Sequence, residues 1–130
     1  MPGRIALTIL LLWACHAHAL EFVDSEACRA NELPLGAPAR VAAERDGAHV
    51  RVKVLANFGC QTTAGHARVR EARGVIELSA DTILPGHITP ARKCTRTLTY
   101  RFAVESRREM RVVFLKDGQP EGEGVLSSGK

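Results

Sequence analysis

The chain of 130 residues has few aromatic side chains, no C-x-x-C pair and no apolar run long enough to cross a membrane. Phe, Trp and Tyr together make up 5% of the residues, so a core must consist mainly of Val, Leu, Ile and Ala. Without a C-x-x-C pair, neither a thioredoxin-type redox pair nor a zinc knuckle has support. The length indicates a single domain and excludes a barrel of alternating strands and helices, which needs about 250 residues.

Residues 1–19 have the parts of a secretory signal peptide. An arginine near the start is followed by an uncharged apolar run over residues 5–14, and residues 17–19 form a small-x-small cleavage site. We expect cleavage between Ala19 and Leu20. The mature chain is then exported, either periplasmic or secreted, and contains no transmembrane segment.

A competing signal lies within the same segment. Leu12, Trp13, Ala14 and Cys15 resemble the bacterial lipobox, in which the cysteine is lipidated and becomes the new N-terminus. Trp13 departs from the small or β-branched residue that is usual there, so we favour plain export. A membrane anchor is expected only if Cys15 is lipidated.

Three cysteines remain after removal of the signal peptide, and export places them in an oxidising compartment. Cys60 directly follows one strongly alternating segment, and Cys94 directly precedes another. If these segments pair antiparallel, the two cysteines meet at one end of the sheet. We therefore predict the disulfide Cys60–Cys94, which leaves Cys28 free or intermolecular.

Apolar and polar residues alternate along residues 49–58 and 95–104, which is typical of half-buried strands. The same period appears in residues 75–80, whereas residues 112–115 are apolar on both faces. The alternation predicts buried side chains at Val52, Val54, Ile76, Leu78, Tyr100, Phe102 and Phe114. It predicts more exposed side chains at Arg51, Lys53, Glu77, Thr99 and Arg101.

Turn signals lie between the strands, at residues 46–47, 72–74 and 116–119. Strands at this spacing, with such turns between them, predict an all-β fold. We expect an antiparallel immunoglobulin-like β-sandwich over residues 20–118, with a small β-barrel as the second choice. Residues 20–45 are expected to be an irregular entry segment in which residues 39–44 can form an edge strand. The glycine-rich residues 119–130 are expected to be a flexible tail. In pattern, the chain is similar to small exported β-sandwich modules of bacteria, but no motif transfers a functional site.

No pattern indicates catalytic chemistry or a cofactor. A copper or zinc site made of Cys60, His66, His87 and Cys94 is the alternative, since thiolate and imidazole suit these metals. It competes with the disulfide for both sulfur atoms. Cys28 lacks a catalytic cysteine signature. We therefore expect a non-enzymatic binding, envelope or accessory module with an unknown protein or envelope partner.

The basic side chains give no reason to expect a nucleic-acid partner. The formal net charge is only +4 and falls to +3 when Arg4 leaves with the signal peptide. The tyrosine and most phenylalanines alternate inward, where they cannot stack on bases. We expect one outer sheet face with ion pairs to Glu71 and Glu77, carrying the basic residues Arg51, Lys53, Arg68, Arg70, Arg96 and Arg101.

Overall fold

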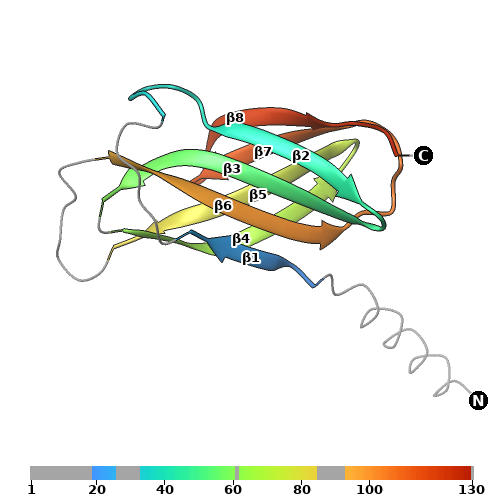
Figure 1. The fold of residues 1–130 in the computed structure, drawn as a ribbon, viewed down its shortest axis with the longest axis horizontal. Helices are drawn as coiled ribbons and strands as arrows, with labels where there is room; N and C mark the ends of the chain where they lie inside the picture. The colour runs from blue at the N-terminus through green and yellow to red at the C-terminus, as the bar shows by residue number, and fades with distance from the viewer. Residues whose placement is uncertain (1–18, 26–32, 61, 85–92, 130) are drawn as a thin grey trace, which may run out of the picture.

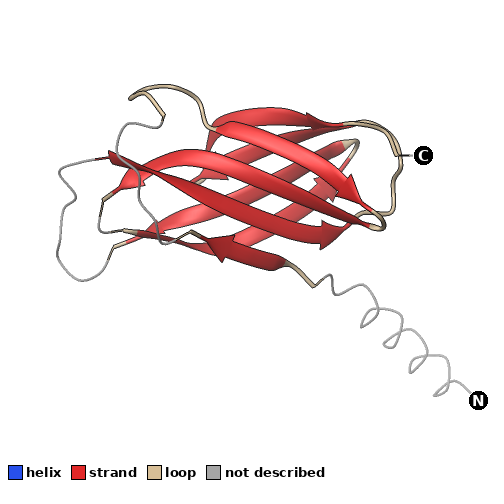
Figure 2. Ribbon diagram, viewed as in Figure 1, coloured by secondary structure: helices blue, strands red, loops and turns tan. Residues whose placement is uncertain are grey.

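The structure is a computed structural model that describes residues 19–25, 33–60, 62–84 and 93–129. Figure 2 shows strands and connecting loops, with no helix, over these residues. Within the same ranges, no helix is long and apolar enough to span a membrane. The eight strands are β1 (Glu21–Asp24), β2 (Arg40–Asp46), β3 (His49–Gly59), β4 (Thr63–Ala72), β5 (Val75–Ile83), β6 (Lys93–Ala103), β7 (Met110–Lys116) and β8 (Gln119–Leu126).

The strands form two four-stranded sheets that pack as a β-sandwich (Figure 1). The first sheet has the order β1-β6-β3-β2, and the second has the order β4-β5-β7-β8. At the centre of the first sheet, β3 and β6 pair antiparallel, with Val52 opposite Tyr100 and Val54 opposite Leu98. The two segments with the clearest alternation are thus neighbours, as the predicted disulfide requires.

The core lies between the two sheets and contains every residue that the alternation places inside. Val52, Val54, Ile76, Leu78, Tyr100 and Phe114 have no accessible surface, and Phe102 is 2% exposed. The five residues predicted to be more exposed all retain accessible surface. Most core residues are aliphatic, and the aromatic members are Phe58, Tyr100, Phe102 and Phe114. Phe22 also packs edge-on against Tyr100, with the ring centroids 5.0 Å apart.

Three two-residue turns lie at the glycine-containing positions that the sequence marks. Arg73 and Gly74 both have positive φ, at 53° and 79°, as do Asp117 and Gly118, at 50° and 80°. Positive φ at both central residues is the requirement of a type I′ hairpin turn. Gly47 alone has positive φ in the first hairpin, at 63°. These turns connect β2 to β3, β4 to β5 and β7 to β8.

The expectation of purely antiparallel sheets is wrong, because β5 and β7 pair in parallel. The chain leaves the second sheet after β5, crosses to the first sheet to form β6, and returns as β7. Two successive crossings between the sheets restore the original strand direction. The second sheet is therefore mixed.

The expected flexible tail at residues 119–130 is also wrong, since residues 119–126 form β8 and Leu126 is 1% exposed. The glycines that suggested mobility instead permit close packing. A side chain at Gly122 or Gly124 would overlap the backbone carbonyl of Ala39 or Val41. The domain therefore extends beyond residue 118. The entry segment at residues 20–45 contains β1 and most of β2. Strand β2 matches the edge strand expected over residues 39–44, whereas β1 was not expected.

Candidate functional site

Cys60 and Cys94 lie at the same end of the sandwich and form the predicted disulfide. Cys60 directly follows β3, and Cys94 is the second residue of β6, opposite Phe58. The Cα atoms are 5.3 Å apart, inside the range of about 4.4–6.8 Å that a disulfide requires. We call this end of the sandwich the disulfide end. Cys28 lies outside the described residues.

The alternative copper or zinc site is not assembled in the described part of the chain. Both sulfur atoms that it needs are bonded to each other. His66 lies on β4 and places Nδ1 3.4 Å from Oδ2 of Asp81, with both side chains largely exposed. His87 lies outside the described residues. Over the described ranges, no three His, Cys, Asp or Glu side chains are grouped so that they could hold a metal ion.

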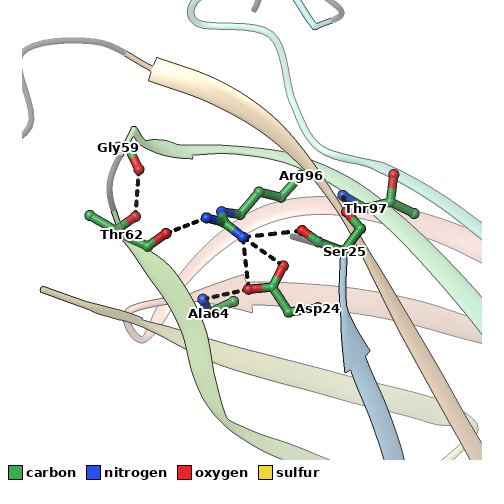
Figure 3. A network of polar contacts seen from close by, with 7 residues as sticks. All are labelled: Asp24, Ser25, Gly59, Thr62, Ala64, Arg96 and Thr97. Carbon is green, nitrogen blue, oxygen red and sulfur yellow. Dashed lines mark hydrogen bonds and ion pairs between the residues drawn. The ribbon is translucent and has the colours of Figure 1, made fainter. Parts of the chain in front are cut away.

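A buried arginine, two residues after Cys94 on β6, joins both sheets. Figure 3 shows its polar contacts. Nη1 of Arg96, on β6, donates to the two carboxylate oxygens of Asp24 at 3.1 and 3.0 Å. It also donates to the carbonyl of Ser25 at 3.1 Å, while Nη2 donates to the carbonyl of Thr62. Oδ2 of Asp24 accepts a further bond from the backbone N–H of Ala64 at 3.0 Å. Because Asp24 is on β1 and Ala64 on β4, the network connects the edge strands of the two sheets.

Burial makes this ion pair structurally important. The side chain of Arg96 is 8% exposed and that of Asp24 is 14% exposed. Nε of Arg96 has no partner among the described atoms. Removing the only ionic partner of a charge that is buried this deeply lowers the free energy of unfolding by about 3–5 kcal/mol. We therefore assign Arg96 and Asp24 to holding the sandwich together.

The expectation that Arg96 lies on an outer sheet face is wrong. Arg96 is two residues before Leu98 and four before Tyr100, so it shares their inward-facing side of β6. The alternation of side chains along β6 therefore already indicated that Arg96 faces inward. Arg96 can be buried between the sheets because Asp24, which is 72 residues away in the sequence, lies within hydrogen-bonding distance.

A second network fixes the chain that leads into β2. The backbone N–H of Leu33 donates to Oγ1 of Thr95 at 3.0 Å, and Nδ2 of Asn57 donates to the Leu33 carbonyl at 3.0 Å. Oγ1 of Thr95 donates to Oδ1 of Asn57 at 2.8 Å, and Nζ of Lys116 donates to the Asn57 carbonyl at 2.8 Å. The disulfide end is therefore held by one covalent bond and two polar networks.

The two seams between the sheets differ. At one seam, β8 packs directly on β2, and the backbone N–H of Ala39 donates to the carbonyl of Glu121 at 2.7 Å. The small residues Gly122 and Gly124 make that approach possible. This seam is closed by backbone contact.

Among the described residues, the opposite seam, between β1 and β4, is open along part of its length. Strand β1 has only four residues, whereas β4 has ten and β6 has eleven. A groove of about 820 Å³ lies where β1 is too short to cover the second half of β4. Its lining includes the apolar residues Leu20, Val69 and Phe102 and the charged residues Arg68, Glu71 and Glu105. We call this groove the open seam.

The basic residues do not form the single outer face that the sequence suggests. Arg51, Lys53 and Arg101 are on the first sheet, and Arg68 and Arg70 are on the second. Arg51 lies 3.8 Å from Glu44, and Arg101 lies 3.5 Å from Glu21, both at exposed positions. Such surface ion pairs contribute little to stability. Because these residues are divided between the two sheets and Arg96 is buried, they do not form one basic outer face.

Tyr100 is the one described group with a strongly shifted pKa. Burial raises the pKa of its hydroxyl well above the ordinary value of 10.0. The hydroxyl donates to the carbonyl of Ser79 at 2.8 Å and thereby links the two sheets. This bond satisfies a polar atom inside the core, and we assign Tyr100 to the fold.

Sequence reasoning therefore found the disulfide and missed the open seam. The alternation places Phe102 inside, but the groove exists only because a short β1 lies beside a long β4. Comparison of the chain with protein-family models, with curated proteins and with solved structures finds no match.

Proposed function

We propose that the chain is an exported β-domain that acts without catalysis, as a binding or accessory module of the cell envelope or its surroundings. The signal-peptide pattern of residues 1–19 supports export. The Cys60–Cys94 disulfide is compatible with it, because disulfides persist in oxidising compartments. Cleavage after Ala19 gives a soluble form, and lipidation of Cys15 gives an anchored one.

The open seam is the observation that carries the binding role. It combines an edge strand, β4, with an apolar floor that no other strand of the described chain covers. The opposite seam of the same sandwich is closed by backbone contact. Extended segments of partner proteins commonly bind by adding a strand to such an edge. We therefore place the partner at the open seam.

The immunoglobulin-like topology stays a prediction. Two four-stranded sheets over one core support it, and the parallel pair of β5 and β7 counts against it. The metal-handling alternative has no comparable support among the described residues, since its sulfur atoms form the disulfide.

Site-specific photocrosslinking in the producing cell tests the binding role. Ala72 and Ala42 are both exposed alanines, but Ala72 lines the open seam and Ala42 is on β2 of the other sheet. A photoreactive residue at position 72 should give a discrete adduct with another protein, and the same residue at position 42 should not. Equal adducts at both positions, or none at position 72, would contradict the proposal.

Protein chemistry on the same cells tests export. The mature chain should begin at Leu20, and mass spectrometry should show the Cys60–Cys94 bond. Retention of Met1 would exclude cleavage, whereas an acylated Cys15 at the N-terminus would establish the anchored form.

A further inference from the structure

We propose that the open seam accepts an extended peptide segment in which acidic and apolar residues alternate. This inference rests on the proposed binding role and specifies the chemistry of the partner. The segment would add as a fifth strand to the second sheet, along residues 67–72 of β4.

The edge of β4 is available over these residues. Strand β4 is the terminal strand of the second sheet, with β5 on its inner side. Asp24 contacts the beginning of the strand, at the backbone N–H of Ala64. Farther along, no described strand pairs with the outer edge of β4, so alternate backbone N–H and C=O groups of residues 67–72 have no strand partner on that side. An added strand would satisfy them through main-chain hydrogen bonds.

The side chains of β4 form two rows, because successive residues of a strand point to opposite faces. Ala67 and Val69 pack towards the core, and Val69 forms part of the groove lining with Leu20 and Phe102. The side chains of an added strand that point the same way as this row would contact the apolar lining of the groove. They should therefore be apolar too. Acidic side chains on that side would be repelled by Glu71, which follows Val69 in the same row.

The other row is basic. Arg68 and Arg70 are exposed on the outer face of the second sheet. Arg70 lies 4.0 Å from Glu77 with its side chain 76% exposed, and Arg68 has no acidic partner among the described residues. Opposite charges are favourable between directly paired residues of neighbouring strands. The added strand should therefore carry Glu or Asp on this face, at every second position.

The same arginines argue against a second copy of this chain as the occupant. A two-fold antiparallel pairing of two β4 strands centred on Val69 would put Arg68 of one copy opposite Arg70 of the other. Centring the pairing on either arginine would put that arginine opposite itself. Like charges directly opposite each other are unfavourable. The β-bulge between Gly65 and Arg68 also interrupts regular pairing towards the start of the strand.

Peptide binding by fluorescence anisotropy tests the inference. The probe is a short labelled peptide whose core alternates glutamate and valine, and the comparison peptide has the same composition with the glutamates and valines in separate blocks. The purified protein should bind the alternating peptide and bind the block peptide much more weakly. Hydrogen exchange should show new protection of the backbone amides of residues 67–72 in the complex.

Two charge-matched double variants complete the test. Arg68→Glu/Arg70→Glu should weaken binding of the alternating peptide by about tenfold or more, because two favourable charge pairs become unfavourable. Arg40→Glu/Lys53→Glu makes the same charge change at exposed positions of the first sheet and should leave binding unchanged. Circular dichroism should show that both variants keep the strand spectrum.

The following results would overturn the inference: equal binding of both peptides, equal loss of binding in both variants, no binding at all, or protection outside residues 67–72. Dimerisation of the protein through β4 would instead make a second copy the occupant. If photocrosslinking from Ala72 captures a partner without an alternating acidic segment, the proposed binding role stands and this inference fails.

Discussion

Replacing Asp24 by alanine should expose how strongly the disulfide end depends on one buried ion pair. The substitution removes two hydrogen bonds from Nη1 of Arg96 and one from the backbone N–H of Ala64. The guanidinium keeps its bonds to the carbonyls of Ser25 and Thr62. A positive charge that is 8% exposed then has no ionic partner among the described residues.

We expect Asp24→Ala to lower the free energy of unfolding by about 3–5 kcal/mol, the range for leaving one member of a buried ion pair unpaired. Glu21→Ala is the matched control, because Glu21 is also on β1 and also pairs with an arginine of β6. Its side chain is 67% exposed and that of Arg101 is 33% exposed. The control should therefore cost less than about 1 kcal/mol.

The double variant Asp24→Ala/Arg96→Met separates the charge effect from loss of packing. This double variant removes both charges and keeps an unbranched apolar side chain at position 96. It should restore much of the stability, because the unpaired buried charge accounts for most of the cost of the single variant. Urea unfolding with the disulfide intact measures all four proteins. The reasoning is refuted if Asp24→Ala costs no more than Glu21→Ala, or if the double variant is less stable than Asp24→Ala.

The remaining predictions concern the core and the closed seam. Phe102→Ala should cost about 3–5 kcal/mol, whereas Thr99→Ala should cost less than about 1; similar losses in urea unfolding would contradict the observed register. Because the raised pKa of Tyr100 keeps it neutral in the folded state, stability should fall as the pH rises above 10.0, where the unfolded tyrosine ionises first. Tyr100→Phe should reduce this loss, and an unchanged alkaline profile would exclude the assignment. Gly122→Val should destabilise the protein by about 1–3 kcal/mol, since the new side chain would overlap the carbonyl of Ala39; an unchanged thermal midpoint would show that β8 does not pack on β2.

Local patterns in the chain were enough to predict the strands around the two cysteines. Alternation with period two depends only on which face of a strand is buried, and it placed Val52 and Tyr100 correctly. The disulfide followed because an antiparallel pair brings the end of β3 to the start of β6. Turns at Gly47, Gly74 and Gly118 were also recognisable, since a positive φ favours glycine.

Other features were decided only by contacts between segments far apart in the chain. Strand β8 has too many glycines to look like a strand, yet it forms one because β7 pairs with it and β2 requires small residues at Gly122 and Gly124. Arg96 is buried because Asp24 reaches it from β1, a partner that no local pattern identifies. The open seam arises from a mismatch in length between β1 and β4 on different sheets. Side-chain alternation is a local property, whereas the neighbour of a strand, the partner of a buried charge and the gap between two sheets exist only after the chain has folded.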